Sequence, residues 1–272
     1  MAKVLITGTS GYLGSCLYNE MISGKTKEVQ SLEGRLNEIK AGSLDFDLVI
    51  HCAGALRYRK DEHYSSNNEG TKFLIEGLKK ETPIVYISSK SIYGTQRNGI
   101  LDESSMPMPD DDYGNSKYLG EQLVIKSGLP YLILRSSTLF GLGFKNLGPA
   151  FPSVGTKMLF LGKDISLNSP DIIHDYLYIK DFCSIIVRLS ETTNTWNNTF
   201  NVAGPHQSLY EMIKEIDKIA MPSKGKIQFS NKPSNPGFLL DSTKLINVLG
   251  PNIYTKNEVI FNRIVEYLKS IS

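Results

Sequence analysis

Residues 3–14 read KVLITGTSGYLG, and three kinds of local structure follow one another within them. The apolar, β-branched run Lys3–Thr7 predicts a buried strand. Three glycines then follow at a spacing of three, where glycine permits a tight turn and a close approach of backbone to a ligand. A helical pattern continues to about Ile22, so the unpaired N–H groups of its first turn face the glycines.

A glycine-rich turn between a strand and a helix predicts that the pyrophosphate of a dinucleotide binds there. The alternative is that these glycines serve packing alone. The predicted contacts are Gly8, Ser10, Gly11, Tyr12, Leu13 and Gly14.

Apolar runs and helical patterns alternate along the rest of the first half. Further strands are predicted at Lys27–Leu32, Phe46–Ala53, Pro83–Ser88 and Tyr131–Arg135, and helices over about Glu62–Lys80 and Tyr113–Ser127. This alternation predicts an α/β protein with a doubly wound parallel sheet, a Rossmann fold. The segment from Gly34 to Asp45 is short, so any third strand and its helix are trimmed.

Bulk composition narrows the function classes. The 272 residues are enough for one large domain or a domain plus a small lobe, and the formal net charge of +2 is too small to indicate nucleic-acid binding. The three cysteines are widely spaced in apolar runs and are interpreted as free thiols in a reducing compartment. No apolar run approaches the roughly 18 residues of a membrane span, so a cytoplasmic protein is expected. The four histidines lack metal-ligand spacing, and no metal site is predicted.

Two stretches are candidates for further contacts with the dinucleotide. After the second strand, an acidic Glu33 would suit the ribose 2′-hydroxyl of NAD, whereas Arg35, followed by Leu36, would suit the 2′-phosphate of NADP. NADP is weakly favoured and NAD remains open. After the third strand come the small residues Cys52, Ala53 and Gly54, against which a cofactor can lie. His51, inside that strand, is interpreted as a core histidine.

Tyr113 and Lys117 stand at positions i and i+4 of a predicted helix, on one face. An unperturbed phenol has a pKa near ~10, and a nearby ammonium favours the phenolate. The pair is therefore a candidate for acid–base work at a carbonyl or alcohol, although such spacing on a helix surface is common. Hydroxyl groups of Ser88–Ser91 lie where the fourth strand ends, and ligands bind at that end of an open α/β sheet.

Taken together, these residues resemble the extended short-chain dehydrogenases/reductases, the NAD-dependent epimerase/dehydratase family. The resemblance covers essentially the whole chain. It implies that Tyr113 is the general acid/base, that Lys117 holds the nicotinamide ribose, and that Ser89 hydrogen-bonds the reacting oxygen. The matching motifs are Thr7-Gly8-x-x-Gly11-x-x-Gly14, Ala53-Gly54-Ala55, Asn67-x-x-Gly70-Thr71, Ser88-Ser89-x-x-Ile92-Tyr93-Gly94, Tyr113-x-x-x-Lys117 and Leu134-Arg135 followed by Gly141.

The resemblance also implies Asn67 as a supporting member of the catalytic set. It divides the chain into a dinucleotide-binding domain, residues 1–140 with further core segments near 172–203, and a smaller substrate-binding α/β lobe, mainly residues 141–272. The implied substrate contacts are Ser91, Thr138, His174 and Lys232. His174 and Lys232 replace arginines common in nucleotide-sugar enzymes, and neither reproduces the bidentate grip of arginine on a diphosphate.

Within the family, the sequence favours an NAD(P)H-dependent reductase of a 4-keto sugar nucleotide. The pair Lys90-Ser91 stands where dehydratases have Asp-Glu, and the C-terminal pattern is similar to that of dTDP-4-dehydrorhamnose reductases. An NAD-dependent nucleotide-sugar 4-epimerase is the alternative, and a dinucleotide-binding regulatory protein without turnover is the second. The expected partner is a nucleotide sugar, with no nucleic acid and no membrane, and a homodimer is a family expectation.

Overall fold

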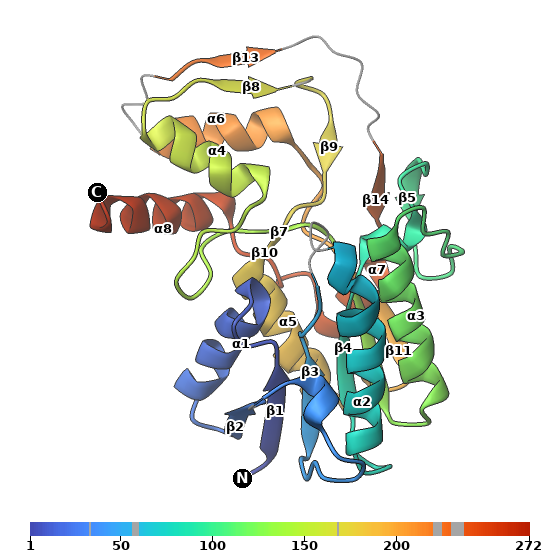
Figure 1. Cartoon of the computed structure of the whole chain (residues 1–272). Coiled ribbons are helices and arrows are strands. Elements are labelled where there is room, and N and C mark those ends of the chain that lie inside the picture. The colour runs from blue at the N-terminus through green and yellow to red at the C-terminus, as the bar shows by residue number, and fades with distance from the viewer. Residues whose placement is uncertain (33, 56–59, 168, 220–224, 230–236) are drawn as a thin grey trace.

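The computed structural model describes residues 1–32, 34–55, 60–167, 169–219, 225–229 and 237–272 (Figure 1). Within them, a six-stranded sheet with parallel pairing throughout forms the base of the molecule. From edge to edge its strands are β2 (Glu28–Ser31), β1 (Lys3–Thr7), β3 (Leu48–His51), β4 (Ile84–Ser89), β6 (Tyr131–Ser136) and β11 (Asn198–Val202). The predicted α/β fold with a doubly wound parallel sheet is confirmed.

Helices cover both faces of this sheet. Alternate residues of a strand point to opposite faces, so Val4 and Ile6 pack toward α1 (Tyr12–Ser23) and α5 (Ile179–Glu191). Leu5, between them, packs toward α2 (Gly70–Gly77) and α3 (Asp112–Lys126). Because both faces are buried, the strands read as continuous apolar runs. The chain's second strand is the exception, since β2 lies at the edge and is half exposed.

The order of the strands reverses beside β1, where the chain goes to β2 on one side and returns to β3 on the other. In a doubly wound sheet, such a reversal opens a crevice at the carboxyl ends of the two strands. Gly8 begins the turn after β1 with φ +72°, and a Cβ there would lie 2.6 Å from the backbone nitrogen of Ala53. Only glycine fits where the two chain segments meet so closely.

The connection from β2 to β3 is short, as the sequence predicts. In the described part of this connection, the single short helix η1 (Leu36–Glu38) replaces a third strand and its helix. The helix expected over Glu62–Lys80 is broken instead. It begins with η2 (Lys60–Glu62) and a π-helical turn η3 (Ser65–Glu69), and α2 ends at Gly77 because Leu78 forms a parallel bridge with Leu44. A π turn inserts one residue and re-aims side chains, and such turns are common at functional sites.

Most elements after β6 gather beyond the carboxyl ends of the sheet, in the upper half of Figure 1. Four pairs of short strands occur outside the main sheet in the described residues: β7–β10, β9–β12, β8–β13 and β5–β14. The strands are β5 (Gly99–Leu101), β7 (Leu139–Phe140), β8 (Ile165–Leu167), β9 (Ile173–His174), β10 (Leu177–Tyr178), β12 (Gln207–Ser208), β13 (Ile227–Phe229) and β14 (Phe238–Leu240). The remaining helices are η4 (Lys90–Tyr93), α4 (Phe151–Phe160), η5 (Thr193–Thr195), α6 (Leu209–Ile219), α7 (Thr243–Leu249) and α8 (Asn257–Ser270).

Helix α4 is not evident from the sequence, because glycines and prolines crowd the stretch from Gly143 to Gly155. Pro152 sits in its first turn, where a missing N–H costs nothing. Gly155 lies inside the helix, close to the ring of Phe151. Packing against α6 and α8 therefore holds a helix whose local propensity is poor. Among the described residues, no helix is long and apolar enough to cross a membrane.

Candidate active site

The glycine turn leads directly into α1. The N–H of Gly11 donates to the carbonyl of Gly8 at 2.9 Å, and no side chain caps the first turn of the helix. A Cβ on Gly14 would lie 2.2 Å from the Gly8 carbonyl oxygen, so the helix packs on the turn at a distance that requires glycine. Ser10 and Gly11 are exposed. The uncapped N–H groups of α1 are thus turned toward an accessible surface, as anion binding requires.

The side chain of Tyr12 is engaged with the protein itself. Its hydroxyl donates to the carbonyl of Gly141 at 2.7 Å, and its ring lies against Gly143 and Gly148, where a Cβ on either glycine would clash with it. Burial raises the pKa of this phenol above its ordinary value. Tyr12 therefore ties α1 to the loop after β7.

A buried chain of hydrogen bonds joins the ends of β1 and β3 to α2. The N–H of Ala53 donates to Thr7 Oγ1 at 3.1 Å, and that hydroxyl donates to His51 Nδ1 at 2.7 Å. On the other side, Thr71 Oγ1 donates to the Asn67 carbonyl at 2.7 Å, so it must accept from His51 Nε2 at 2.9 Å. These partners require the neutral Nε2–H tautomer, and burial lowers the pKa of His51 to about 3. His51 is a core histidine, as interpreted from the sequence.

Asn67 stands on the π turn and is 1% exposed. Its Oδ1 accepts from the N–H of Ala55 at 2.9 Å, and its Nδ2 donates to Ser116 Oγ at 2.8 Å. Ser116 Oγ in turn donates to the carbonyl of Tyr113 at 2.8 Å. Asn67 therefore links the loop after β3 to the helical turn that carries Tyr113, with Ser116 as the intermediate. The sequence does not single out Ser116, although it lies in the Tyr-x-x-x-Lys motif.

Lys117 is buried beneath that loop. Its ammonium donates to the carbonyl of Ile87 at 3.0 Å and lies 5.3 Å from the ring centroid of Tyr86. In the part of the chain that the structure describes, no carboxylate lies within ion-pair distance of it. Burial lowers its pKa to about 8, against the opposing influence of Cys52 and Glu121. A Cβ on Gly54 would lie 3.1 Å from Nζ, so this glycine leaves room for the ammonium.

Cys52 and Ala53 are half-buried and Gly54 is exposed, so the predicted cofactor-facing residues after β3 border accessible space. Burial raises the pKa of the Cys52 thiol to about 12. Its sulfur is therefore protonated near neutral pH and serves as a small apolar wall beside Lys117.

Ser89 ends β4 and begins η4. Its Oγ accepts from the N–H of Ser91 at 3.2 Å and donates to Ser91 Oγ at 3.2 Å. The first turn of α3 packs directly on this segment, because a Cβ on Gly114 would lie 2.4 Å from the Ser91 carbonyl oxygen. Asp111 caps α3 by accepting from the N–H of Gly114 at 2.7 Å. The turns that carry Ser89 and Tyr113, distant in sequence, are thus held against each other.

Tyr113 is half-buried, and its ring lies edge-on to that of His63, with centroids 5.6 Å apart. Edge-to-face contact is one of the arrangements that aromatic pairs prefer. Helix α3 presents Lys117 one turn further along the same face.

The sequence analysis does not predict a buried network of ion-pair and hydrogen-bond contacts that lies under the site. Glu121 and Arg135 form a two-pronged ion pair with N–O distances of 3.1 and 2.9 Å, and Ser88 also donates to Glu121. Arg135 donates to Tyr93 OH at 2.8 Å, and this hydroxyl donates to Asn201 Oδ1 at 2.9 Å. One feature of the sequence could have indicated that Glu121 is buried: it falls four residues after Lys117, on the same face of α3.

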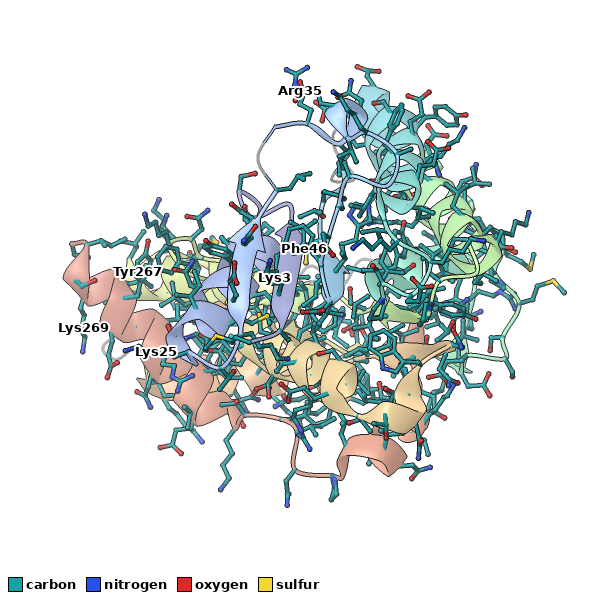
Figure 2. The ribbon with its side chains drawn as sticks, turned by 90° about the horizontal axis from the view of Figure 1, so that it is seen from below. Lys3, Lys25, Arg35, Phe46, Tyr267 and Lys269 are labelled. Carbon is teal, nitrogen blue, oxygen red and sulfur yellow. The ribbon has the colours of Figure 1, made fainter. Side chains whose placement is uncertain are left out.

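The remaining predicted residues belong to other segments of the chain. Arg35 is exposed, and Figure 2 shows its side chain at the edge of the molecule, directed outward. Leu36 packs against Gly70 at the start of α2, where it contributes to the core. Thr138 is exposed and His174 is half-buried, its ring stacked on Tyr176 with centroids 4.9 Å apart. Burial lowers the pKa of His174. Lys232 lies outside the described residues.

Comparisons with known proteins agree with this architecture. The GDP-6-deoxy-D-talose 4-dehydrogenase of Aggregatibacter actinomycetemcomitans is 27% identical over 278 residues, which cover 91% of each protein. The UDP-glucuronic acid 4-epimerase of Bacillus cereus, solved with NAD, has a TM-score of 0.83 at 20% identity, covering 99% of this chain and 97% of that one. RMD from Pseudomonas aeruginosa, solved with NADPH, has a TM-score of 0.83 at 22% identity and covers both chains completely.

Residues 4–203 match the family described as "NAD dependent epimerase/dehydratase family". The match confirms the expected class of enzyme and its nicotinamide dinucleotide cofactor, with NAD and NADP both represented among the solved neighbours. Because it takes in the glycine turn, the Tyr113 helix and the sheet up to its last strand, the chain is a member of the NAD-dependent epimerase/dehydratase family of enzymes.

Proposed function

We propose that this protein reduces a 4-keto sugar nucleotide with NAD(P)H. The observation that carries the proposal is the buried ammonium of Lys117. An unpaired buried charge is costly, and such groups cluster at functional sites. The 27%-identical relative is named for dehydrogenation at carbon 4 of a nucleotide-linked sugar, which is the same redox step read in the other direction.

Each group has a distinct part in this proposal. The glycine turn and the uncapped start of α1 hold the pyrophosphate, and Lys117 holds the nicotinamide ribose. When bound, the nicotinamide ring supplies the hydride. Tyr113 donates the proton to the substrate oxygen, Ser89 donates a hydrogen bond to the same oxygen, and Lys117 favours the phenolate that remains. Asn67, through Ser116, keeps the Tyr113 turn in place.

We also propose that the elements after residue 141, apart from α5, η5, β11 and α7, form the substrate-binding part. They lie beyond the carboxyl ends of the strands, which is the side where open α/β sheets bind ligands (Figure 1).

Replacement of Tyr113 by phenylalanine tests the proposal. Removal of a general acid/base lowers turnover by roughly 10²-fold or more. The assay follows NADPH and NADH consumption with 4-keto sugar nucleotides, and cofactor binding is measured in parallel. Unchanged activity of the Phe variant would contradict the assignment of Tyr113 as the proton donor. It would favour a dinucleotide-binding regulatory protein of the same fold.

A nucleotide-sugar 4-epimerase uses the same three groups and is the second candidate, since a solved neighbour of the same fold is such an enzyme. The two differ in whether the cofactor leaves after hydride transfer or is recycled in place. We expect the purified protein to be largely free of nucleotide, as quantified by mass spectrometry after denaturation. A stoichiometric amount of tightly held NAD would replace the reductase with the epimerase.

A further inference from the structure

A cavity with no assigned role lies beside the proposed active site. It measures about 450 Å³, within the usual range for small-ligand sites. It is formed where η4, β9 and β14 meet, and Lys90 in its wall is the residue directly after Ser89. The other wall residues are Thr95, Gln96, Ile173, His174, Asp175, Gly237, Phe238 and Leu239.

The polar centre of this wall is an ion pair. Lys90 Nζ donates to Asp175 Oδ1 at 2.8 Å, with the two side chains 24% and 4% exposed. The same ammonium donates to the Phe238 carbonyl at 3.4 Å and lies 5.1 Å from the centre of that ring. Asp175 Oδ2 accepts from the N–H of Leu240 at 3.1 Å. These contacts hold both charged groups in place before any ligand arrives, which limits the entropy lost on binding.

The pair offers a ligand both a donor and an acceptor. An ammonium has three N–H groups, and partners among the described residues take two of those of Lys90. Oδ1 of Asp175 accepts from Lys90 and Oδ2 accepts from the N–H of Leu240, and each oxygen has a second lone pair. A hydroxyl group can accept one hydrogen bond and donate another. A hydroxyl of a sugar ring can therefore accept from Lys90 and donate to Asp175.

The charge of the cavity argues against the diphosphate as its occupant. Among its described wall residues, Lys90 and Asp175 are the charged ones, and they neutralise each other. Burial lowers the pKa of His174, which disfavours its cationic form. A diphosphate offers acceptors alone and carries negative charge, which a fixed carboxylate opposes. The apolar and aromatic surface of Ile173, Phe238 and Leu239 suits the C–H face of a sugar ring.

We propose that this cavity receives the glycosyl part of the nucleotide sugar, and that the Lys90–Asp175 pair selects it by binding one of its hydroxyl groups. The proposal rests on the proposed function, because it assumes a sugar nucleotide as substrate. It assigns Lys90 a specificity role that its place in the sequence, beside the catalytic hydroxyl, does not reveal.

The test compares nucleotide sugars with the matching nucleoside diphosphates. Isothermal titration of the NADP⁺-loaded protein uses UDP-glucose with UDP, GDP-mannose with GDP and dTDP-glucose with dTDP. In Lys90→Met, we expect the nucleotide sugar that binds best to bind about ten-fold more weakly, as for loss of a hydrogen bond to a charged group. Affinity for its diphosphate should change less than two-fold. Lys72→Met, at an exposed lysine of α2, is the matched control.

Loss of Lys90 leaves Asp175 buried without its partner and risks misfolding. The double variant Lys90→Met/Asp175→Asn removes both charges while an amide oxygen can still accept from Leu240. We expect it to melt near the wild-type temperature and to show the same selective loss of nucleotide-sugar affinity.

Equal weakening of sugar and diphosphate, or wild-type affinity in the double variant, would overturn the proposal. If the wild type binds nucleotide sugars and Tyr113→Phe abolishes turnover while Lys90→Met changes nothing, the cavity assignment alone fails. If the wild type binds NADP⁺ and none of the nucleotide sugars, the proposed function fails together with it.

Discussion

At the scale of single residues, the site depends on an ammonium that the fold stabilises poorly. Lys117 has no carboxylate partner among the described residues, and its main contact is the Ile87 carbonyl at 3.0 Å. A site that keeps a desolvated charge gives up stability in exchange for function. The same logic does not apply to His51, whose two ring nitrogens are both satisfied by threonines.

Replacing Lys117 by methionine should stabilise the protein while it removes activity. The pKa of Lys117 is lowered from 10.5 to about 8, so the unfolded chain binds more protons than the folded one between these pH values. The unfavourable contribution is therefore fully present below pH 8 and fades as the pH rises to 10.5. We expect Lys117→Met to melt several degrees higher at pH 7, with the difference narrowing above pH 8. A lower melting temperature at pH 7 would contradict this account.

Arg35 gives a prediction about the choice of cofactor. It is exposed after β2 and free to reach a 2′-phosphate, which it would bind through a charge-assisted hydrogen bond. Arg35→Ala should weaken NADPH binding by several-fold to about ten-fold and leave NADH binding unchanged. Lys40→Ala, another exposed cation of the same connection, is the control. Equal effects on both cofactors would remove Arg35 from the site.

At the scale of elements, the relation between η4 and α3 brings the hydroxyl and the phenol together. Gly114 permits this contact, because without a side chain the backbone of α3 can pack directly against the Ser91 carbonyl. The Asp111 cap holds the first turn of α3 from the other side. Asp111 belongs to an acidic stretch of sequence and acts as the N-cap of this helix.

Gly114→Ala should separate these two elements without unfolding the protein. The added methyl would begin 2.4 Å from the Ser91 oxygen, so α3 must shift. Displacement of a catalytic group by about 1 Å can cost up to roughly 10² in rate. We expect kcat to fall ten-fold or more. Gly24→Ala is the control, because its Cβ would meet its nearest neighbour at an ordinary 3.5 Å and its φ is −71°. Full activity of Gly114→Ala would disprove the role given to this contact.

At the scale of the whole molecule, the Glu121–Arg135 pair ties the sheet to the segments above it. Arg135 belongs to β6 and Glu121 to α3, and Tyr93 carries the network on to Asn201 of β11 and to the carbonyl of Asp102. Asn201 also donates to the Leu101 carbonyl of β5 at 3.0 Å. One buried network thus joins the six-stranded sheet to the β5–β14 pair (Figure 1).

Breaking this pair from one side should be far worse than removing both partners. Glu121→Met leaves the Arg135 guanidinium buried without its anion, which costs about 3–5 kcal/mol. In Glu121→Met/Arg135→Met most of that loss should return, because apolar side chains replace both charges. Urea unfolding of the two single variants and the double variant measures the coupling. Additive losses would show that the two residues act independently.

Much of this molecule follows from the sequence because its signals are local. Strand positions, the glycine turn, the start of α3 and the short link after β2 all rest on residues within a few positions of one another. The pair Tyr113 and Lys117 is likewise readable from helical periodicity. Such features survive in isolation because backbone conformation and side-chain spacing depend on near neighbours.

Tertiary structure alone decided which distant groups meet. The sequence does not show that Ser116 links Asn67 to Tyr113, that Lys90 faces Asp175, or that a glycine- and proline-rich stretch becomes helix α4. Buried polar groups must find partners wherever the fold brings them, and these partners lie 49 and 85 positions apart in the first two cases. A single sequence carries no distance between such residues, so the local chemistry of the site could be read from it, whereas its assembly required the fold.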